Sequence, residues 1–110
     1  MIRINSFLKY FLLLLLSLGV NNSYAQESMV KGTVTDSLKK PIEACNVSIQ
    51  GEANGTITDS RGRYTLKVTP YKSITVVYSF VGFAAQKFTF QLTPGETKEL
   101  NVQLKSTVQL

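Results

Sequence analysis

The sequence predicts an all-β protein, a seven-stranded antiparallel β-sandwich of the immunoglobulin or transthyretin type preceded by a signal peptide. Apolar and polar residues alternate with a period of two in nearly every segment after residue 28, as in half-buried strands. Turn-forming residues separate these segments at short intervals, and no segment there has the periodicity of an amphipathic helix. Many short strands of this kind are typical of two packed antiparallel sheets.

The first 25 residues have the features of an export signal. Basic residues precede an apolar run at residues 10–20, and Ser23 and Ala25 fit the small-x-small pattern for cleavage. The run is shorter than the roughly 20 residues that a membrane-spanning helix needs, which favours cleavage over an uncleaved anchor. We therefore expect the mature chain to begin at Gln26, with residues 26–29 as a short lead.

Seven strands are expected to follow, each assigned from its alternating pattern. They cover residues 30–35, 44–50, 56–58, 63–68, 74–80, 87–92 and 99–105. Val77 and Val81 make the second face of the fifth strand partly apolar, which predicts a central strand covered on both sides. The three proline residues all fall between strands, where a missing N–H group costs no ladder hydrogen bond.

The turn between the third and fourth strands has the clearest local signature. Asp59 can accept hydrogen bonds from backbone N–H groups further along the turn, and Gly62 can adopt a positive φ. We predict that Asp59 and Gly62 are structural turn residues.

Residues 30–104 are expected to form one domain, with 105–110 as a C-terminal tail or the start of a linker. The chain from residue 26 onward has ten basic residues and seven acidic ones. The basic residues are scattered apart from Lys39 and Lys40, so nothing in the sequence indicates a nucleic-acid partner.

Residue composition argues against enzymatic chemistry. The chain has no histidine and one cysteine, and its acidic residues form no metal-binding ladder, so we predict no catalytic, metal or cofactor site. A calcium ion between Asp36 and Asp59 is the less favoured alternative to two turn residues. Cys45 shares an apolar face with Val47 and Ile49, which predicts a buried thiol with no disulfide partner; an intermolecular bridge is the alternative.

Two aromatic residues fall in turns. Tyr71 and Phe83 are therefore candidate exposed contacts, for example with a glycan, whereas Tyr78 and Phe80 are expected in the core.

Several short motifs together resemble one family. They are Val30–Asp36, Pro41-Ile42, Ala44–Val47, Gly55–Leu66 and Ser79–Phe83. The set resembles the carboxypeptidase-regulatory-like domain (CarboxypepD_reg-like), as found at the N-terminus of TonB-dependent outer-membrane transporters of the SusC/RagA type.

The resemblance implies a non-catalytic module that is exported to the periplasm and associated with the outer membrane. It would be an N-terminal extension or accessory domain of a nutrient uptake system. Its partners would be transporter components or the rest of a longer parent chain, contacted at an exposed strand edge. Lysines expected on outward strand faces would blunt the other edges; these are Lys31, Lys67, Lys87 and Lys105. The alternative is a stand-alone glycan-binding (starch-binding-like) or immunoglobulin-like adhesion module.

Overall fold

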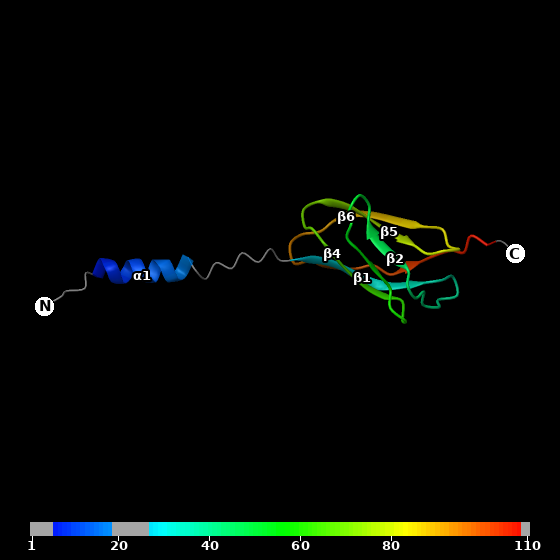
Figure 1. Ribbon diagram of the computed structural model, residues 1–110, viewed down its shortest axis with the longest axis horizontal. Coiled ribbons are helices and arrows are strands. Elements are labelled where there is room, and N and C mark those ends of the chain that lie inside the picture. The colour runs from blue at the N-terminus through cyan, green and yellow to red at the C-terminus, as the bar shows by residue number, and fades with distance from the viewer. Residues whose placement is uncertain (1–5, 19–26, 109–110) are drawn as a thin grey trace.

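The computed structural model describes residues 6–18 and 27–108, which form one helix and eight strands (Figure 1). The elements are α1 (Ser6–Leu18), β1 (Ser28–Thr35), β2 (Asn46–Ile49), β3 (Gly55–Ile57), β4 (Arg63–Val68), β5 (Ser73–Ser79), β6 (Gln86–Gln91), β7 (Thr97–Glu99) and β8 (Val102–Gln103). Within the described ranges, no helix is both long and apolar enough to cross a membrane. The expected cleavage site, from Ser23 to Gln26, lies outside the described residues.

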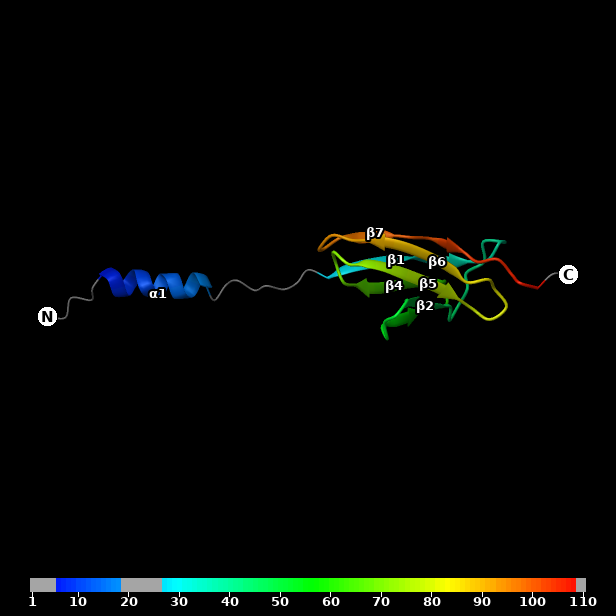
Figure 2. The same ribbon diagram turned by 90° about the horizontal axis from the view of Figure 1, so that it is seen from above.

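The strands form two packed sheets, as the alternating sequence predicts. One sheet has the order β4-β1-β7, with β8 also beside β1, and the other has the order β3-β2-β5-β6 (Figure 2). All pairs are antiparallel except those of β1 with β7 and β8, which are parallel. The prediction of a purely antiparallel sandwich is therefore wrong at this edge. The chain leaves β6 at the end of the sandwich where β1 begins, so the last strands run in the same direction as β1.

The expected strand over residues 99–105 is divided into β7 and β8, which raises the count from seven strands to eight. The division lies beside Gly32, where a Cβ atom would come within 2.0 Å of the Leu100 carbonyl oxygen. Leu100 N–H still donates to the Lys31 carbonyl (2.8 Å), but Asn101 accepts the Thr33 N–H through its side-chain Oδ1 (2.9 Å). A side-chain acceptor thus replaces one backbone acceptor and interrupts the regular ladder.

The core lies between the two sheets and is formed by fifteen buried hydrophobic residues, all within residues 30–104. Two tyrosines connect the sheets. Tyr64 from β4 donates to the Leu100 carbonyl (2.6 Å), so Tyr78 from β5 donates to the Tyr64 hydroxyl (2.5 Å). Their rings also meet edge to face, with centroids 5.4 Å apart. Burial raises the pKa of both phenols.

Cys45 is a buried free thiol, as its apolar strand face predicts. Its Sγ lies 3.5 Å from the Ser79 carbonyl oxygen. Burial is the main cause that raises the pKa of the thiol above its ordinary value. The protonated form is therefore favoured, which makes the sulfur a poor nucleophile.

The sandwich continues past residue 104, into the segment that the sequence marks as a tail or linker. Ala84 N–H donates to the Lys105 carbonyl (2.9 Å), and Thr107 N–H donates to the Gly82 carbonyl (2.8 Å). Residues 105–107 therefore belong to the folded domain. They lie at the C-terminal end of the sandwich, which we define as the end where β1 finishes and the chain leaves (Figure 1).

Candidate interaction surfaces

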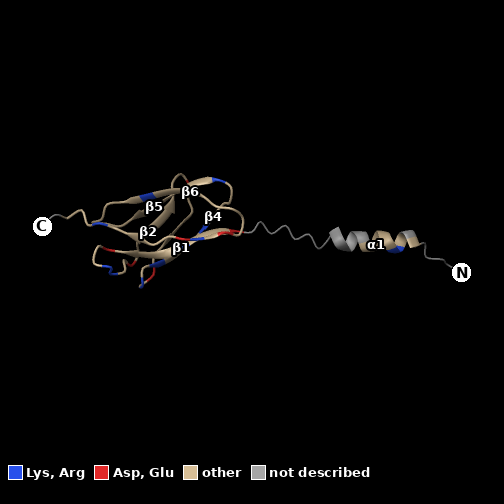
Figure 3. Ribbon diagram, turned by 180° about the vertical axis from the view of Figure 1, so that it is seen from behind, with Lys and Arg blue, Asp and Glu red and all other residues tan. Residues whose placement is uncertain are grey.

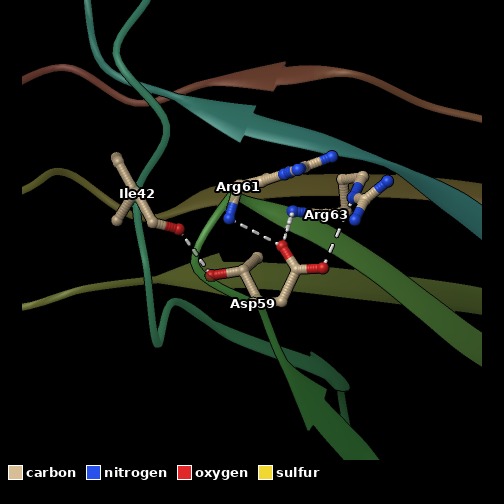
Figure 4. Close-up of polar contacts among 5 residues, drawn as sticks. Ile42, Asp59, Arg61 and Arg63 are labelled. Carbon is tan, nitrogen blue, oxygen red and sulfur yellow. Dashed lines mark hydrogen bonds and ion pairs between the residues drawn. The ribbon is translucent and has the colours of Figure 1, made fainter.

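The Asp59 loop joins β3 to β4 and is held by its own side chain. Asp59 Oδ1 accepts the backbone N–H groups of Arg61 and Arg63, both at 2.9 Å, and Oδ2 lies 3.4 Å from Arg63 Nε (Figure 4). Gly62 has a φ of 74° and donates to the Asp59 carbonyl (2.9 Å). The backbone bond from Arg63 is the main cause that lowers the pKa of Asp59. Both oxygens of the Asp59 carboxylate therefore have partners within the loop itself.

Thr58 ties this loop to the chain that leads into β2. Its hydroxyl donates to the Ile42 carbonyl (2.5 Å) and accepts the Cys45 N–H (2.9 Å), and the residue is only 2% exposed. A buried hydroxyl that both donates and accepts a hydrogen bond needs no further partner. In the sequence, only the position of Thr58 at the end of an expected strand points to this structural role.

A second loop of the same construction follows β1. Asp36 Oδ1 accepts the N–H groups of Leu38 (2.8 Å) and Lys40 (2.9 Å), and Lys39 donates to the Asp36 carbonyl (3.0 Å). Lys39 has a φ of 63°, the position that glycine occupies in the Asp59 loop. Both loops begin with Thr-Asp-Ser, a repeat that could have revealed their equivalence from sequence. The loop presents Leu38, Lys39 and Lys40 to solvent.

The described residues contain no group of three or more His, Cys, Asp or Glu side chains placed to hold a metal ion. The carboxylates of Asp36 and Asp59 each accept two backbone N–H groups, and Cys45 is buried. These side chains therefore have structural partners, and they form no arrangement of nucleophile and base.

The two candidate aromatic contacts do not form one platform. Tyr71 is 69% exposed in the turn before β5, whereas Phe83, after β5, is half-buried and packs against the core. β5 separates the two residues, which lie at opposite ends of the sandwich. Neither lines any of five surface recesses of about 240 to 480 Å³. Phe83 is only partly exposed, because the bonds of its loop to residues 105–107 hold this loop against the sandwich. The expectation of Phe80 in the core is wrong, since Phe80 follows the end of β5 and is 36% exposed.

β6 is an edge strand of its sheet, and it is long, regular and carries a single charged residue. β3, β7 and β8 have at most three residues each, and β4 contacts β3 of the other sheet. β6 has six residues, with Lys87 exposed and with Phe88 and Phe90 only half-buried. Lys98 Nζ lies 5.3 Å from the centre of the Phe90 ring. An added strand would find free backbone groups and a partly apolar flank here.

The four lysines expected on outward strand faces are all exposed; they are Lys31, Lys67, Lys87 and Lys105. Lys67 also forms an ion pair with Glu27 at 3.4 Å. Charge is therefore present on or beside β1, β4 and β8, which discourages edge-to-edge pairing there, whereas β6 carries Lys87 alone.

A comparison with known protein families identifies the domain type. The family model of the CarboxypepD_reg-like domain matches residues 30–110. The chain belongs to this family. The match includes residues 105–107, which pair with the β5–β6 loop.

Two curated relatives of this CarboxypepD_reg-like domain are receptors. TonB-dependent receptor P39 of Formosa agariphila is 37% identical over 101 residues, which are 90% of this chain and 9% of the receptor. TonB-dependent receptor SusC of Bacteroides thetaiotaomicron is 29% identical over 107 residues, which are 96% of this chain and 10% of the receptor. The chain thus spans about a tenth of the length of these relatives.

Among solved structures, a chain of a type II cohesin–X-dockerin complex from Acetivibrio cellulolyticus resembles this domain with a TM-score of 0.57. The two are 20% identical, and the match covers 72% of this chain and 58% of the other. A likeness at this identity concerns the fold alone.

Proposed function

We propose that this CarboxypepD_reg-like domain is an exported, non-catalytic module of a TonB-dependent nutrient uptake system. It works in the periplasm at the outer membrane, as an N-terminal extension or accessory domain of a transporter. The observation that carries the proposal is the match of nearly the whole chain to about a tenth of two TonB-dependent receptors. The apolar segment at the N-terminus, with its small-x-small pattern, supports export.

The module acts by contact with transporter components or with the rest of a longer parent chain. The free edge of β6 is the surface best suited to this contact, because the strand is six residues long and contains the half-buried Phe88 and Phe90. A partner strand that pairs with β6 would gain backbone hydrogen bonds and would place alternate side chains beside these two residues.

Site-specific photo-crosslinking in the native periplasm tests this proposal. A photo-reactive residue replaces Thr89 on β6, and the matched control replaces Thr65, which is exposed at the centre of β4. We expect Thr89 to capture an outer-membrane transporter component and Thr65 to capture none. A crosslink at Thr65 alone would show that the other sheet makes the contact. The absence of any transporter crosslink would refute the proposal.

A further inference from the structure

Exposed apolar side chains gather at one end of the sandwich. Within the described part of the domain, six large hydrophobic residues are exposed, and five of them lie at the C-terminal end; these are Leu38, Ile57, Phe80, Val81 and Val108. The sixth, Tyr71, lies at the opposite end. Leu38 is 75% exposed and Val81 is 92% exposed, although both stand in loops that backbone hydrogen bonds hold in place. The gathering of these side chains at one end of the domain indicates a surface that is covered in use.

The same end carries an excess of positive charge. Five basic residues stand there against three acidic ones; these are Lys39, Lys40, Arg61, Arg63 and Lys105 against Asp36, Glu43 and Asp59 (Figure 3). The backbone already occupies the carboxylates of Asp36 and Asp59. Arg63 also pairs with Asp59 (3.4 Å), which leaves four basic residues at this end against Asp36 and Glu43. At the opposite end, Lys67 pairs with Glu27 (3.4 Å) and Lys72 with Glu52 (3.2 Å).

We infer that the C-terminal end of the sandwich rests on an anionic phospholipid surface. Leu38 and Val81 enter the boundary between headgroups and acyl chains, and Lys39, Lys40 and Lys105 face the lipid phosphates. The inference rests on the proposed function in one respect, because the outer-membrane location supplies the bilayer. The chain also leaves the sandwich at this end, beside the surface that would face the membrane.

The arrangement favours lipid over an acidic protein partner. Leu38 and Val81, the two most exposed, are aliphatic and stand on separate loops, and two lysines follow Leu38 directly in the sequence. Protein interfaces instead concentrate their binding energy in a contiguous, well-packed patch that is rich in aromatic residues. Separate apolar tips surrounded by basic residues fit a fluid surface, which closes around each tip and supplies many phosphates.

Vesicle sedimentation with residues 26–110 tests the charge component. This fragment contains every buried residue of the core, so it folds without α1, whose own apolar helix would bind lipid. We expect binding to vesicles that contain phosphatidylglycerol, weakened by salt, and none to pure phosphatidylcholine. The double variant Lys39→Gln/Lys40→Gln should bind about 25-fold more weakly, at about fivefold for each charge near the surface. The control Lys67→Gln/Lys72→Gln makes the same change in net charge at the opposite end and should change binding less than about twofold.

Tryptophan fluorescence tests the insertion of the apolar tips. The chain has no tryptophan, so a single introduced one reports its own surroundings. Val81→Trp should shift its emission to the blue on addition of phosphatidylglycerol vesicles, and Tyr71→Trp at the opposite end should not shift. Both sites are exposed, so neither variant disturbs the core.

Three results would overturn the inference: no sedimentation with anionic vesicles, an equal loss of binding in the lysine control, or no blue shift at position 81. If anionic vesicles are not bound and a photo-crosslinker at position 81 captures an acidic receptor segment, the surface is a protein contact instead. These assays use the isolated domain, whereas the proposed function is tested by crosslinking at β6 in cells. Failure of one is therefore distinguishable from failure of the other.

Discussion

Replacing Gly62 by alanine separates two costs that a side chain can have in the Asp59 loop. The first is the positive φ of 74°, which disfavours any residue with a Cβ atom. The second is a collision, because the added Cβ would lie 2.5 Å from the Val34 carbonyl oxygen and 3.0 Å from Pro41 Cβ. Gly51 is a matched control, since its φ is 82° and nothing lies within 4 Å of the position of its Cβ.

The structure gives a different magnitude for each site. A left-handed conformation costs an alanine about 1–2 kcal/mol. Alanine also lowers the conformational entropy of the unfolded chain, which offsets about 0.4–1 kcal/mol of this cost. Gly51→Ala should therefore reduce the free energy of unfolding by about 1 kcal/mol. At Gly62 the collision adds about 1–3 kcal/mol, which gives a total of about 2–4 kcal/mol. The Val34 carbonyl cannot move away freely, because it accepts the Ile42 N–H at 3.0 Å.

Urea denaturation of residues 26–110, followed by circular dichroism, measures both variants against the wild type. We expect the midpoint for Gly62→Ala to fall well below that for Gly51→Ala, with similar slopes. If the two variants agree within about 0.5 kcal/mol, the close approach of Gly62 to Val34 makes no contribution, and the reasoning is refuted.

The buried tyrosines and the buried thiol give three further predictions. Tyr64→Phe should cost about 1–3 kcal/mol, because it leaves the Tyr78 hydroxyl and the Leu100 carbonyl without their partner. Tyr78→Phe should cost only about 0.5–1.5 kcal/mol, because Tyr64 still donates to Leu100, and equal losses in urea melts would contradict this hydrogen-bond direction. Burial raises the pKa of both phenols, so the stability from their neutral form is complete below the unfolded pKa near 10 and is lost as the pH rises above it. A melting temperature that stays constant from about pH 9 to 12 would exclude this effect. Cys45 should react slowly with a thiol reagent in the native protein and rapidly in urea, and fast native labelling or a disulfide-linked dimer would disprove its burial.

The sequence was sufficient for features that local chemistry determines. Alternation of apolar and polar residues predicts the strands and the apolar face that holds Cys45. The Asp59 turn follows from the hydrogen-bonding capacity of aspartate and the freedom of glycine at position 62. A turn at Asp36 is predicted as well, but its likeness to the Asp59 loop is hidden, because a lysine takes the positive φ there in place of glycine.

Features that depend on distant contacts could not be read from local patterns. The break between β7 and β8 lies beside Gly32 and involves Thr33, 68 residues before its partner Asn101 in the chain. Period-two alternation contains no information on strand direction, so the parallel pairing of β1 was missed. The partial burial of Phe83 likewise depends on the bridge between its loop and Ser106.

The parallel pairing of the first and last strands has a mechanical consequence. β1 begins at one end of the sandwich, and β8 finishes at the other. A force that pulls on the two termini therefore slides β1 along β7 and β8. It loads their hydrogen bonds together, including those from Leu100 to Lys31 and from Leu104 to Thr35, each 2.8 Å long. An antiparallel hairpin pulled from its open end would release such bonds one after another. The parallel pairing of β1 with β7 and β8 therefore places these hydrogen bonds in shear under such a force.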